Sequence, residues 1–162
     1  MTIEDYYRTI APKLTNYLIG SGSTYANACD IVQETFLRLW NMRERLQDDP
    51  SQVSGLIYTI ARNIRINMIR HDSHETLQEE IRDEDAGPAA EAPSPSDMEY
   101  LRGRINSALE QLPPLIREAF VLFEISDLSI REIAQITGVT ENLVKVRIHR
   151  AKEKLRPLLA DL

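Results

Sequence analysis

Residues 129–156, SIREIAQITGVTENLVKVRIHRAKEKLR, have the pattern of two helices joined by a tight turn. Ala134 is small enough for two helices to cross there, Gly138 tolerates the positive φ of a turn, and Val144 is an apolar anchor on the second helix. Helices arranged in this way place side chains in the major groove of DNA. The segment therefore predicts a helix-turn-helix that binds DNA.

The second helix of this predicted motif carries a dense basic face. At helical spacing, its apolar stripe consists of Val144, Ile148, Ala151 and Leu155. Around the stripe lie Lys145, Arg147, Arg150, Lys152, Lys154 and Arg156. Basic side chains near the helix start would reach base edges, and those further along would bind phosphates. A solvated helix end is the simpler alternative, but the caps expected at Ser129 and Thr140 favour DNA binding.

The net charge of the chain, −6 at pH 7, at first opposes binding to DNA. The acidity comes from one segment, because residues 73–97 hold 8 acidic side chains and 1 basic one. Residues 1–72 hold 8 of each kind, and residues 98–162 hold 10 basic and 9 acidic side chains. Charges more than about 8–10 Å apart are largely screened at physiological salt. The overall acidity is therefore weak evidence against a nucleic-acid partner.

The acidic segment also divides the chain. It contains three prolines, and beyond Ile81 it has no large apolar side chain. Such a segment buries too little apolar surface to offset the entropy of ordering it. We therefore predict a flexible acidic linker at 73–97, with a frayed helical turn near 77–81, between domains at 1–72 and 98–162.

Both predicted domains consist of helices, since no alternating strand pattern occurs in the sequence. Thr2 and Asp5 fit a capping box at the start of a first helix that extends to about Ile19. The second helix has an apolar stripe of Ala28, Ile31, Val32, Thr35, Phe36, Leu39 and Trp40. A loop at 46–53 and a helix at 54–71 complete the first domain. The predicted fold is all-α, with two small helical domains.

Two helix faces of the N-terminal domain are polar. The first face consists of Asp30, Gln33, Glu34, Leu37 and Arg38. The second consists of Arg62, Asn63, Arg65, Asn67 and Arg70. Asparagine and arginine side chains can hydrogen-bond to bases, but each face taken alone is also typical of an ordinary solvated helix.

Four stretches, in this order along the chain, resemble the extracytoplasmic-function sigma factors, the smallest members of the sigma-70 family. They are DIVQETFLRLW (30–40), LIYTIARNIRINMIRH (56–71), LEQLPPLIREAFVL (109–122) and LSIREIAQITGV with VKVRIHRAKEKL (128–155). The resemblance implies that residues 1–72 are similar to region 2 of these factors and residues 98–162 to region 4. A protein of this kind binds bacterial core RNA polymerase and directs it to promoters.

The resemblance also implies a role for each polar face. In the family, an Asp-x-x-Gln-Glu face of region 2 docks on the clamp helices of the largest polymerase subunit. The matching residues here are Asp30, Gln33 and Glu34, with Leu37 and Arg38 as their neighbours on the face. Region 2 also captures the non-template strand of the −10 element. The resemblance implies that the 46–53 loop contributes to this binding site. The matching helix residues are Arg62, Asn63 and Arg65, and Asn67 and Arg70 on the same helix are expected to join them. Region 4 binds the −35 element as a duplex. The matching residues are Lys145, Val146, Arg147, His149 and Arg150.

A few residues depart from the family pattern. Leu56 stands where the family often has Trp, and Asn67 stands where Asp is usual. On the recognition helix, Leu143 replaces a frequent Thr and Val146 replaces a frequent small polar residue. The resemblance therefore leaves open which −35 sequence this chain reads.

The predicted linker is long enough for both domains to bind one promoter. Its 25 residues, 73–97, span at most about 80–90 Å. Two promoter elements about two helical turns apart are separated by roughly 70 Å. In the family this segment passes near the active-site cleft of the polymerase, and a plain spacer is the alternative.

The sequence offers no candidate catalytic residue, metal site or cofactor site. Its single cysteine, Cys29, lies on an apolar helix face and is expected to be structural. No apolar run approaches the ~20 residues that cross a bilayer. The first residues, MTIEDYYRTIAPK, lack the features of a secretory signal. We therefore expect a cytoplasmic protein without membrane insertion.

Two other functions are compatible with parts of this pattern. A sigma-like decoy would bind an anti-sigma factor without directing transcription, but the basic residues of both DNA faces oppose it. A LuxR-like helix-turn-helix regulator would use the last two helices and leave residues 1–72 without a role. The resemblance to sigma factors accounts for both domains, and it adds an anti-sigma factor as an expected partner.

Overall fold

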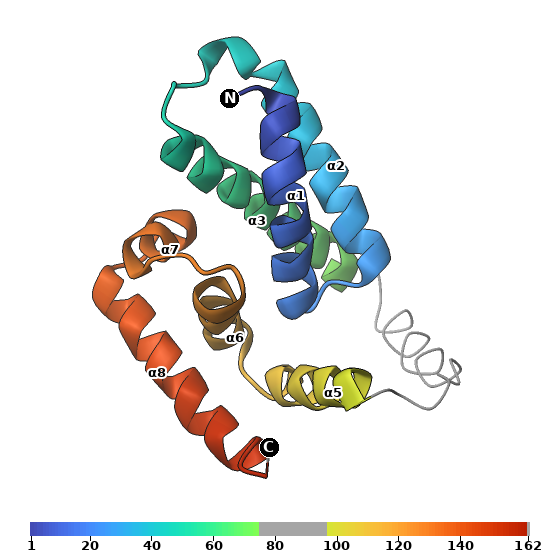
Figure 1. Ribbon diagram of the computed structural model, residues 1–162, viewed down its shortest axis with the longest axis vertical. Coiled ribbons are helices and arrows are strands. Elements are labelled where there is room, and N and C mark those ends of the chain that lie inside the picture. The colour runs from blue at the N-terminus through green and yellow to red at the C-terminus, as the bar shows by residue number, and fades with distance from the viewer. Residues whose placement is uncertain (75–96, 162) are drawn as a thin grey trace.

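The computed structural model describes residues 1–74 and 97–161, which form helices joined by short turns (Figure 1). These residues contain no strand, and the predicted all-α fold is confirmed. The predicted helical turn near 77–81 lies outside the described residues.

The N-terminal half is built from three long helices. These are α1 (Ile3–Gly20), α2 (Tyr25–Asn41) and α3 (Pro50–His74), with a short 3₁₀ turn, η1 (Arg43–Arg45), after α2. The expected capping box is present, because the Thr2 hydroxyl accepts from the Asp5 N–H (3.2 Å) and the Asp5 carboxylate accepts from the Thr2 N–H (2.9 Å). The apolar faces of α1, α2 and α3 pack together, so each helix is held mainly by its neighbours.

The third helix is longer than the sequence predicts. The expected loop at 46–53 ends earlier, because α3 begins at Pro50, and the helix extends to His74 rather than 71. Proline suits a first helical turn, since its fixed φ is helical and its missing N–H has no partner there. The Asp49 carboxylate supports this start by accepting from the Ser51 N–H (3.0 Å).

The C-terminal half contains shorter helices around the predicted helix-turn-helix. They are α5 (Asp97–Glu110), α6 (Pro114–Phe120), a π turn η3 (Val121–Ile125), α7 (Ile130–Thr137) and α8 (Glu141–Leu158). The Arg104 guanidinium binds the Asp161 carboxylate (2.6 and 2.9 Å) and the Leu158 carbonyl (3.2 Å), which ties α5 to the end of α8. α8 runs along the outer edge of the molecule in Figure 1, on the far side of α6 and α7 from the three N-terminal helices.

The two halves share one continuous core. α1 contacts η3, and α3 contacts α7. A Cβ added to Gly20 at the end of α1 would lie 3.0 Å from a methyl group of Val121, so the glycine allows the two elements to approach closely. Val121 and Leu122 are fully buried in the same apolar cluster as Leu14 and Ile57 of the N-terminal half. The described parts of the chain therefore form one packed body.

Candidate nucleic-acid interface

The second helix of the helix-turn-helix presents its basic face to solvent. Its buried side consists of Val144, Ile148, Ala151 and Leu155, as the apolar spacing predicts. Among the predicted −35 residues, the exposed ones are Lys145, Val146, His149 and Arg150, and Arg147 is half-buried. His149 Nε2 lies 3.0 Å from the Glu153 carboxylate, one helical turn further along α8. An exposed helix face of this composition is suited to a DNA groove.

The turn before α8 fixes the orientation of that helix relative to α7. Gly138 has φ 72° and ψ 28°, the left-handed conformation that glycine adopts without strain. Its N–H donates to the Ala134 carbonyl (2.9 Å), which closes the end of α7. At the other end of α7, the Ser129 hydroxyl accepts from the Glu132 N–H (3.1 Å). The caps and turn predicted from the sequence are therefore all present.

Four of the five residues on the polar face of α2 are exposed. Asp30, Gln33, Leu37 and Arg38 are exposed, and Glu34 is half-buried. The Arg38 Nε donates to Glu34 Oε1 (3.1 Å) within the face. These five residues lie on one side of one helix, so a single partner surface can contact all of them.

An apolar groove borders this face, and the sequence pattern does not reveal it. Its volume is about 840 Å³, and it lies between α1 and α2. Among its lining residues are Tyr7, Phe36, Leu37 and Trp40. Trp40 was predicted to be buried with the apolar stripe, but it is 51 % exposed. That prediction was wrong because Trp40 lies at the exposed end of α2, where Arg43 covers one face of its ring at 4.2 Å.

The predicted −10 residues of α3 divide into two groups. Asn63, Asn67 and Arg70 are exposed and lie at i, i+4 and i+7 on one side of the helix. Arg62 and Arg65 are half-buried, because they point toward neighbouring elements of the fold. The structure therefore presents three of the five residues to solvent and involves the other two in internal contacts.

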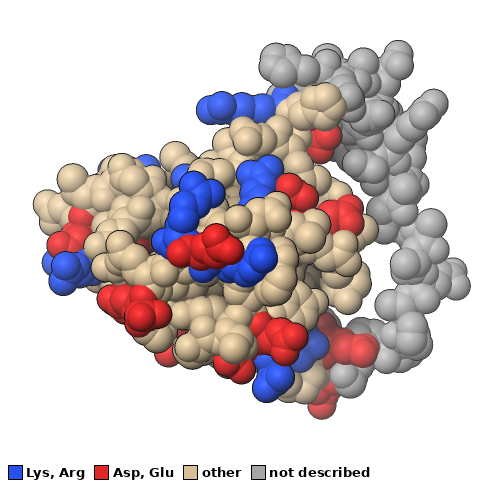
Figure 2. All heavy atoms as spheres, turned by 90° about the horizontal axis from the view of Figure 1, so that it is seen from above, with Lys and Arg blue, Asp and Glu red and all other residues tan. Residues whose placement is uncertain are grey.

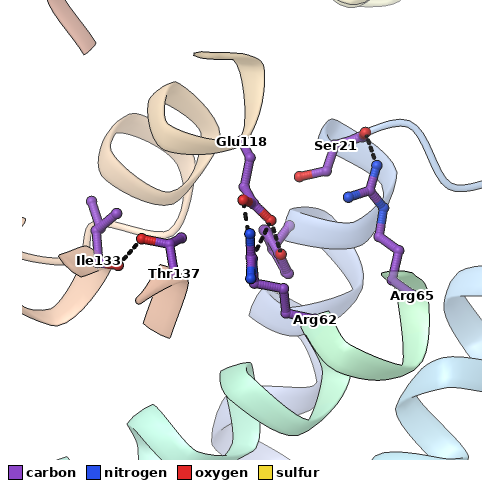
Figure 3. A network of polar contacts seen from close by, with 7 residues as sticks. Ser21, Arg62, Arg65, Glu118, Ile133 and Thr137 are labelled. Atoms are coloured by element: carbon purple, nitrogen blue, oxygen red, sulfur yellow. Dashed lines mark hydrogen bonds and ion pairs between the residues drawn. The ribbon is translucent and has the colours of Figure 1, made fainter. Parts of the chain in front are cut away.

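Arg62 is bound by a carboxylate from the C-terminal half (Figure 3). Its Nε lies 3.1 and 3.0 Å from the two oxygens of Glu118, a residue of α6 that is only 3 % exposed. The Tyr17 hydroxyl of α1 donates to the same carboxylate (2.7 Å). Burial, and then the charge of Glu118, raise the pKa of Tyr17 well above its ordinary value, so this phenol stays a neutral donor.

Two further arginines cap the end of α1. Arg65 Nη2 donates to the Ser21 carbonyl (2.5 Å), as Figure 3 shows, and Arg117 Nε donates to the Gly20 carbonyl (2.6 Å). Burial lowers the pKa of Arg117 below its ordinary value. The last carbonyls of a helix carry partial negative charge, so cations are favoured at this position.

The sequence interpretation missed the contribution of Glu118, Tyr17 and Arg117. A weak signal exists for Glu118, since it lies four residues before the buried Leu122 and therefore on an apolar side of its helix. Tyr17 similarly follows Leu14 by three residues on the buried face of α1. Neither spacing identifies the partner.

The surface charge is mixed. On the face drawn in Figure 2, Lys and Arg side chains lie among Asp and Glu side chains and do not form one broad basic area. In the described parts of the chain, no group of three or more His, Cys, Asp or Glu is placed to hold a metal ion. No helix of residues 1–74 or 97–161 has the length and apolarity that crossing a bilayer requires.

Comparison with known proteins accounts for both halves. The family model for sigma-70 region 2 matches residues 3–75, and the model for sigma-70 region 4 matches residues 102–155. The chain is also 35 % identical over 159 residues to the RNA polymerase sigma factor CarQ of Myxococcus xanthus, covering 98 % of this chain and 90 % of the relative. The chain belongs to the sigma-70 family, in its extracytoplasmic-function group.

Other relatives of this sigma factor agree. It is 31 % identical over 155 residues to the sigma factor RpoE of Cereibacter sphaeroides, covering 94 % of this chain and 83 % of that one. Its fold is similar to that of the sigma factor RpoE in a solved complex with the anti-sigma factor NepR from Bartonella quintana. The TM-score is 0.76 at 26 % identity, over 97 % of this chain and 96 % of that one. Sigma factors are in general not enzymes.

Proposed function

We propose that this sigma factor brings core RNA polymerase to promoters through three surfaces, one for polymerase and two for DNA. The proposal depends on finding two exposed helix faces in one chain. One is the basic face of α8, a helix whose start is fixed by the Thr140 cap and the Gly138 turn, and the other is the polar face of α2. A helix-turn-helix regulator alone would need only the first of these surfaces.

The polymerase surface is the α2 face of Asp30, Gln33, Glu34, Leu37 and Arg38. Leu37 is 59 % exposed and also lines the groove with Trp40, so polar and apolar contacts are available side by side. Interfaces of this kind are centred on exposed large side chains surrounded by polar ones. The clamp helices of the polymerase would lie along α2 and contact Leu37 near the centre.

The two DNA surfaces lie on α3 and α8. Asn63, Asn67 and Arg70 would contact the unpaired −10 strand, together with Arg62 and Arg65 when these are released. Lys145, Val146, Arg147, His149 and Arg150 would contact the −35 duplex. Arg150 and Lys145 can form ion pairs with phosphates or hydrogen bonds to guanine edges. Val146 can make only an apolar contact, and the thymine methyl group is the partner that suits it.

The further partners follow from the relatives. Because the Bartonella RpoE has been solved with an anti-sigma factor, we propose that an anti-sigma factor also binds this chain. We propose that the protein acts in the cytoplasm, without a cofactor and without catalysis of its own, since the polymerase performs the chemistry.

The proposal is tested by run-off transcription with bacterial core polymerase and a promoter library. We expect transcripts from a subset of promoters that disappear when the protein is omitted. Polymerase binding without any transcript would identify the decoy instead. DNA binding without polymerase binding would identify an ordinary helix-turn-helix regulator.

A further inference from the structure

We infer that this sigma factor reads the C5-methyl groups of pyrimidines in the upstream duplex, through an apolar pair formed by Leu143 and Val146 on α8. Thymine carries this methyl group, and so does 5-methylcytosine, so duplex binding becomes sensitive to the methylation of cytosine. The inference rests on the proposed function, which places α8 in the major groove. It adds the chemical group that the helix reads there.

Val146 lies near the centre of the exposed side of α8. At 3.6 residues per turn, a residue two positions after Val144 points nearly opposite to it, and Val144 is fully buried. Val146 is 40 % exposed, and Leu143, one turn earlier, is 38 % exposed. Residues three apart are neighbours on a helix surface. The two side chains therefore lie next to each other on the side of α8 that faces solvent.

The pair lies in the part of the helix that reaches base edges. The Thr140 hydroxyl caps α8 by accepting from the Leu143 N–H (3.1 Å), so the pair belongs to the first turns of the helix. In a helix-turn-helix, the first residues of the second helix contact the bases. Leu143 and Val146 are about 4.5 Å apart along the axis at 1.5 Å per residue, and base pairs are about 3.4 Å apart. The pair can therefore contact two neighbouring base pairs.

An apolar side chain limits what can be read. Leucine and valine side chains have no hydrogen-bonding atoms, so they cannot distinguish the donors and acceptors of base edges. The thymine methyl is the one apolar group that the four ordinary bases present in the major groove. 5-Methylcytosine carries a methyl group on the same ring carbon. The pair should therefore distinguish methylated from unmethylated pyrimidines, and should treat thymine and 5-methylcytosine alike.

The surroundings of the pair favour DNA over a protein partner. Lys145 and Arg150 are exposed beside it, and Arg147 is half-buried. Two side chains that are each less than half exposed offer far less area than the roughly 800 Å² that each partner buries in a standard protein interface. Valine is also a weaker helix former than lysine or arginine, so an exposed valine at this position does not stabilise α8.

The test uses a duplex of known sequence, selected by the full chain from a randomised duplex library. Each thymine of the tightest duplex is replaced in turn by uracil, which lacks only the methyl group. Affinity is measured by fluorescence anisotropy at one fixed salt concentration. We expect uracil to weaken binding about fourfold at each of two neighbouring base pairs, as for the loss of one buried methyl-sized group. Uracil in place of the other thymines should change nothing.

A second comparison examines methylated cytosine. At each sensitive base pair, cytosine and 5-methylcytosine are compared opposite guanine, so that only the methyl group differs. We expect 5-methylcytosine to bind about fourfold more tightly than cytosine, which is the same factor as for thymine over uracil.

Serine variants assign the methyl preference to side chains. Val146→Ser should reduce the ratio of thymine to uracil affinity to about one at one base pair, and Leu143→Ser should do so at its neighbour. Leu115→Ser is the matched control, because Leu115 is 50 % exposed in the same half but lies on α6. It should keep both ratios. All three side chains are exposed, so circular dichroism should show the wild-type fold for each variant.

Four results would overturn the inference. The first is a selected duplex in which no thymine is sensitive to uracil. The second is a methyl preference that survives in both Leu143→Ser and Val146→Ser, which would assign it to DNA shape. The third is a preference for thymine over uracil without one for 5-methylcytosine over cytosine. The fourth is loss of polymerase binding in the serine variants with both methyl ratios unchanged, which would assign the pair to a protein contact.

The same measurements distinguish this inference from the proposed function. Complete absence of duplex binding would contradict both, because the proposed function requires α8 to bind the −35 duplex. Tight duplex binding without any methyl preference would contradict only the inference and leave the proposed function in place.

Discussion

Replacing Gly138 with alanine should destabilise the helix-turn-helix through the backbone alone. The residue has φ 72°, and a Cβ added there would meet nothing within 4 Å, so no steric clash with a neighbour contributes. The left-handed conformation costs a residue with a Cβ about 1–2 kcal/mol. We expect the free energy of unfolding of Gly138→Ala to fall by about that amount in urea denaturation followed by circular dichroism.

A matched glycine-to-alanine substitution elsewhere in the same half should change the free energy of unfolding in the opposite direction. Gly103 lies within α5, and a Cβ added there also meets nothing within 4 Å. Glycine inside a helix is less favourable than alanine by about 0.5–1 kcal/mol, so Gly103→Ala should raise the free energy of unfolding. If Gly138→Ala were neutral or stabilising, the left-handed turn would be refuted, and with it the orientation of α8 on which the DNA surface depends.

Four further predictions address the binding surfaces and the first helix cap. Leu37→Asp should abolish binding to core polymerase in a pull-down without changing the unfolding midpoint, because Leu37 is exposed. Arg150→Ala should weaken duplex binding and lower the slope of log affinity against log salt by about one, as expected for one lost phosphate contact. Asn63→Ala should weaken capture of the −10 single strand and leave duplex binding unchanged. The Thr2 N–H and hydroxyl lower the pKa of Asp5 below 3.8, so its contribution to stability is present above that pH and is lost as pH falls through the lowered value. Acid titrations of unfolding should therefore show a smaller loss below about pH 4 for Asp5→Asn than for wild type.

Local signals predicted the helix-turn-helix almost completely. The capping box of Ser129 with Glu132, the cap at Thr140 and the turn at Gly138 each depend on residues within four positions. Their hydrogen bonds connect neighbours in sequence, so the residue types alone determine where α7 and α8 begin and end. The buried stripe that includes Val144 is equally local, since it follows from the helical period.

The contact between the halves could not be predicted, because its partners are far apart in sequence. Arg62 and Glu118 are separated by 56 positions, and Tyr17 and Glu118 by 101. An arginine on a helix predicts a charged surface, and only the folded structure shows that Arg62 is bound by Glu118 and Arg65 by the Ser21 carbonyl. Trp40 illustrates the reverse error, since helical spacing marks it as buried, although it is 51 % exposed and only Arg43 is recorded over its ring.

The two-site binding of a promoter is tested most directly by footprinting the complex of this protein with core polymerase on a promoter that it transcribes. We expect two protected patches about two helical turns, or roughly 70 Å, apart. Thymines of the non-template strand in the downstream patch should become reactive to permanganate. Arg150→Ala should reduce the protection of the upstream patch. Asn63→Ala should reduce the permanganate reactivity of the downstream thymines. A single protected patch that forms equally well without polymerase would contradict two-site binding by a sigma factor.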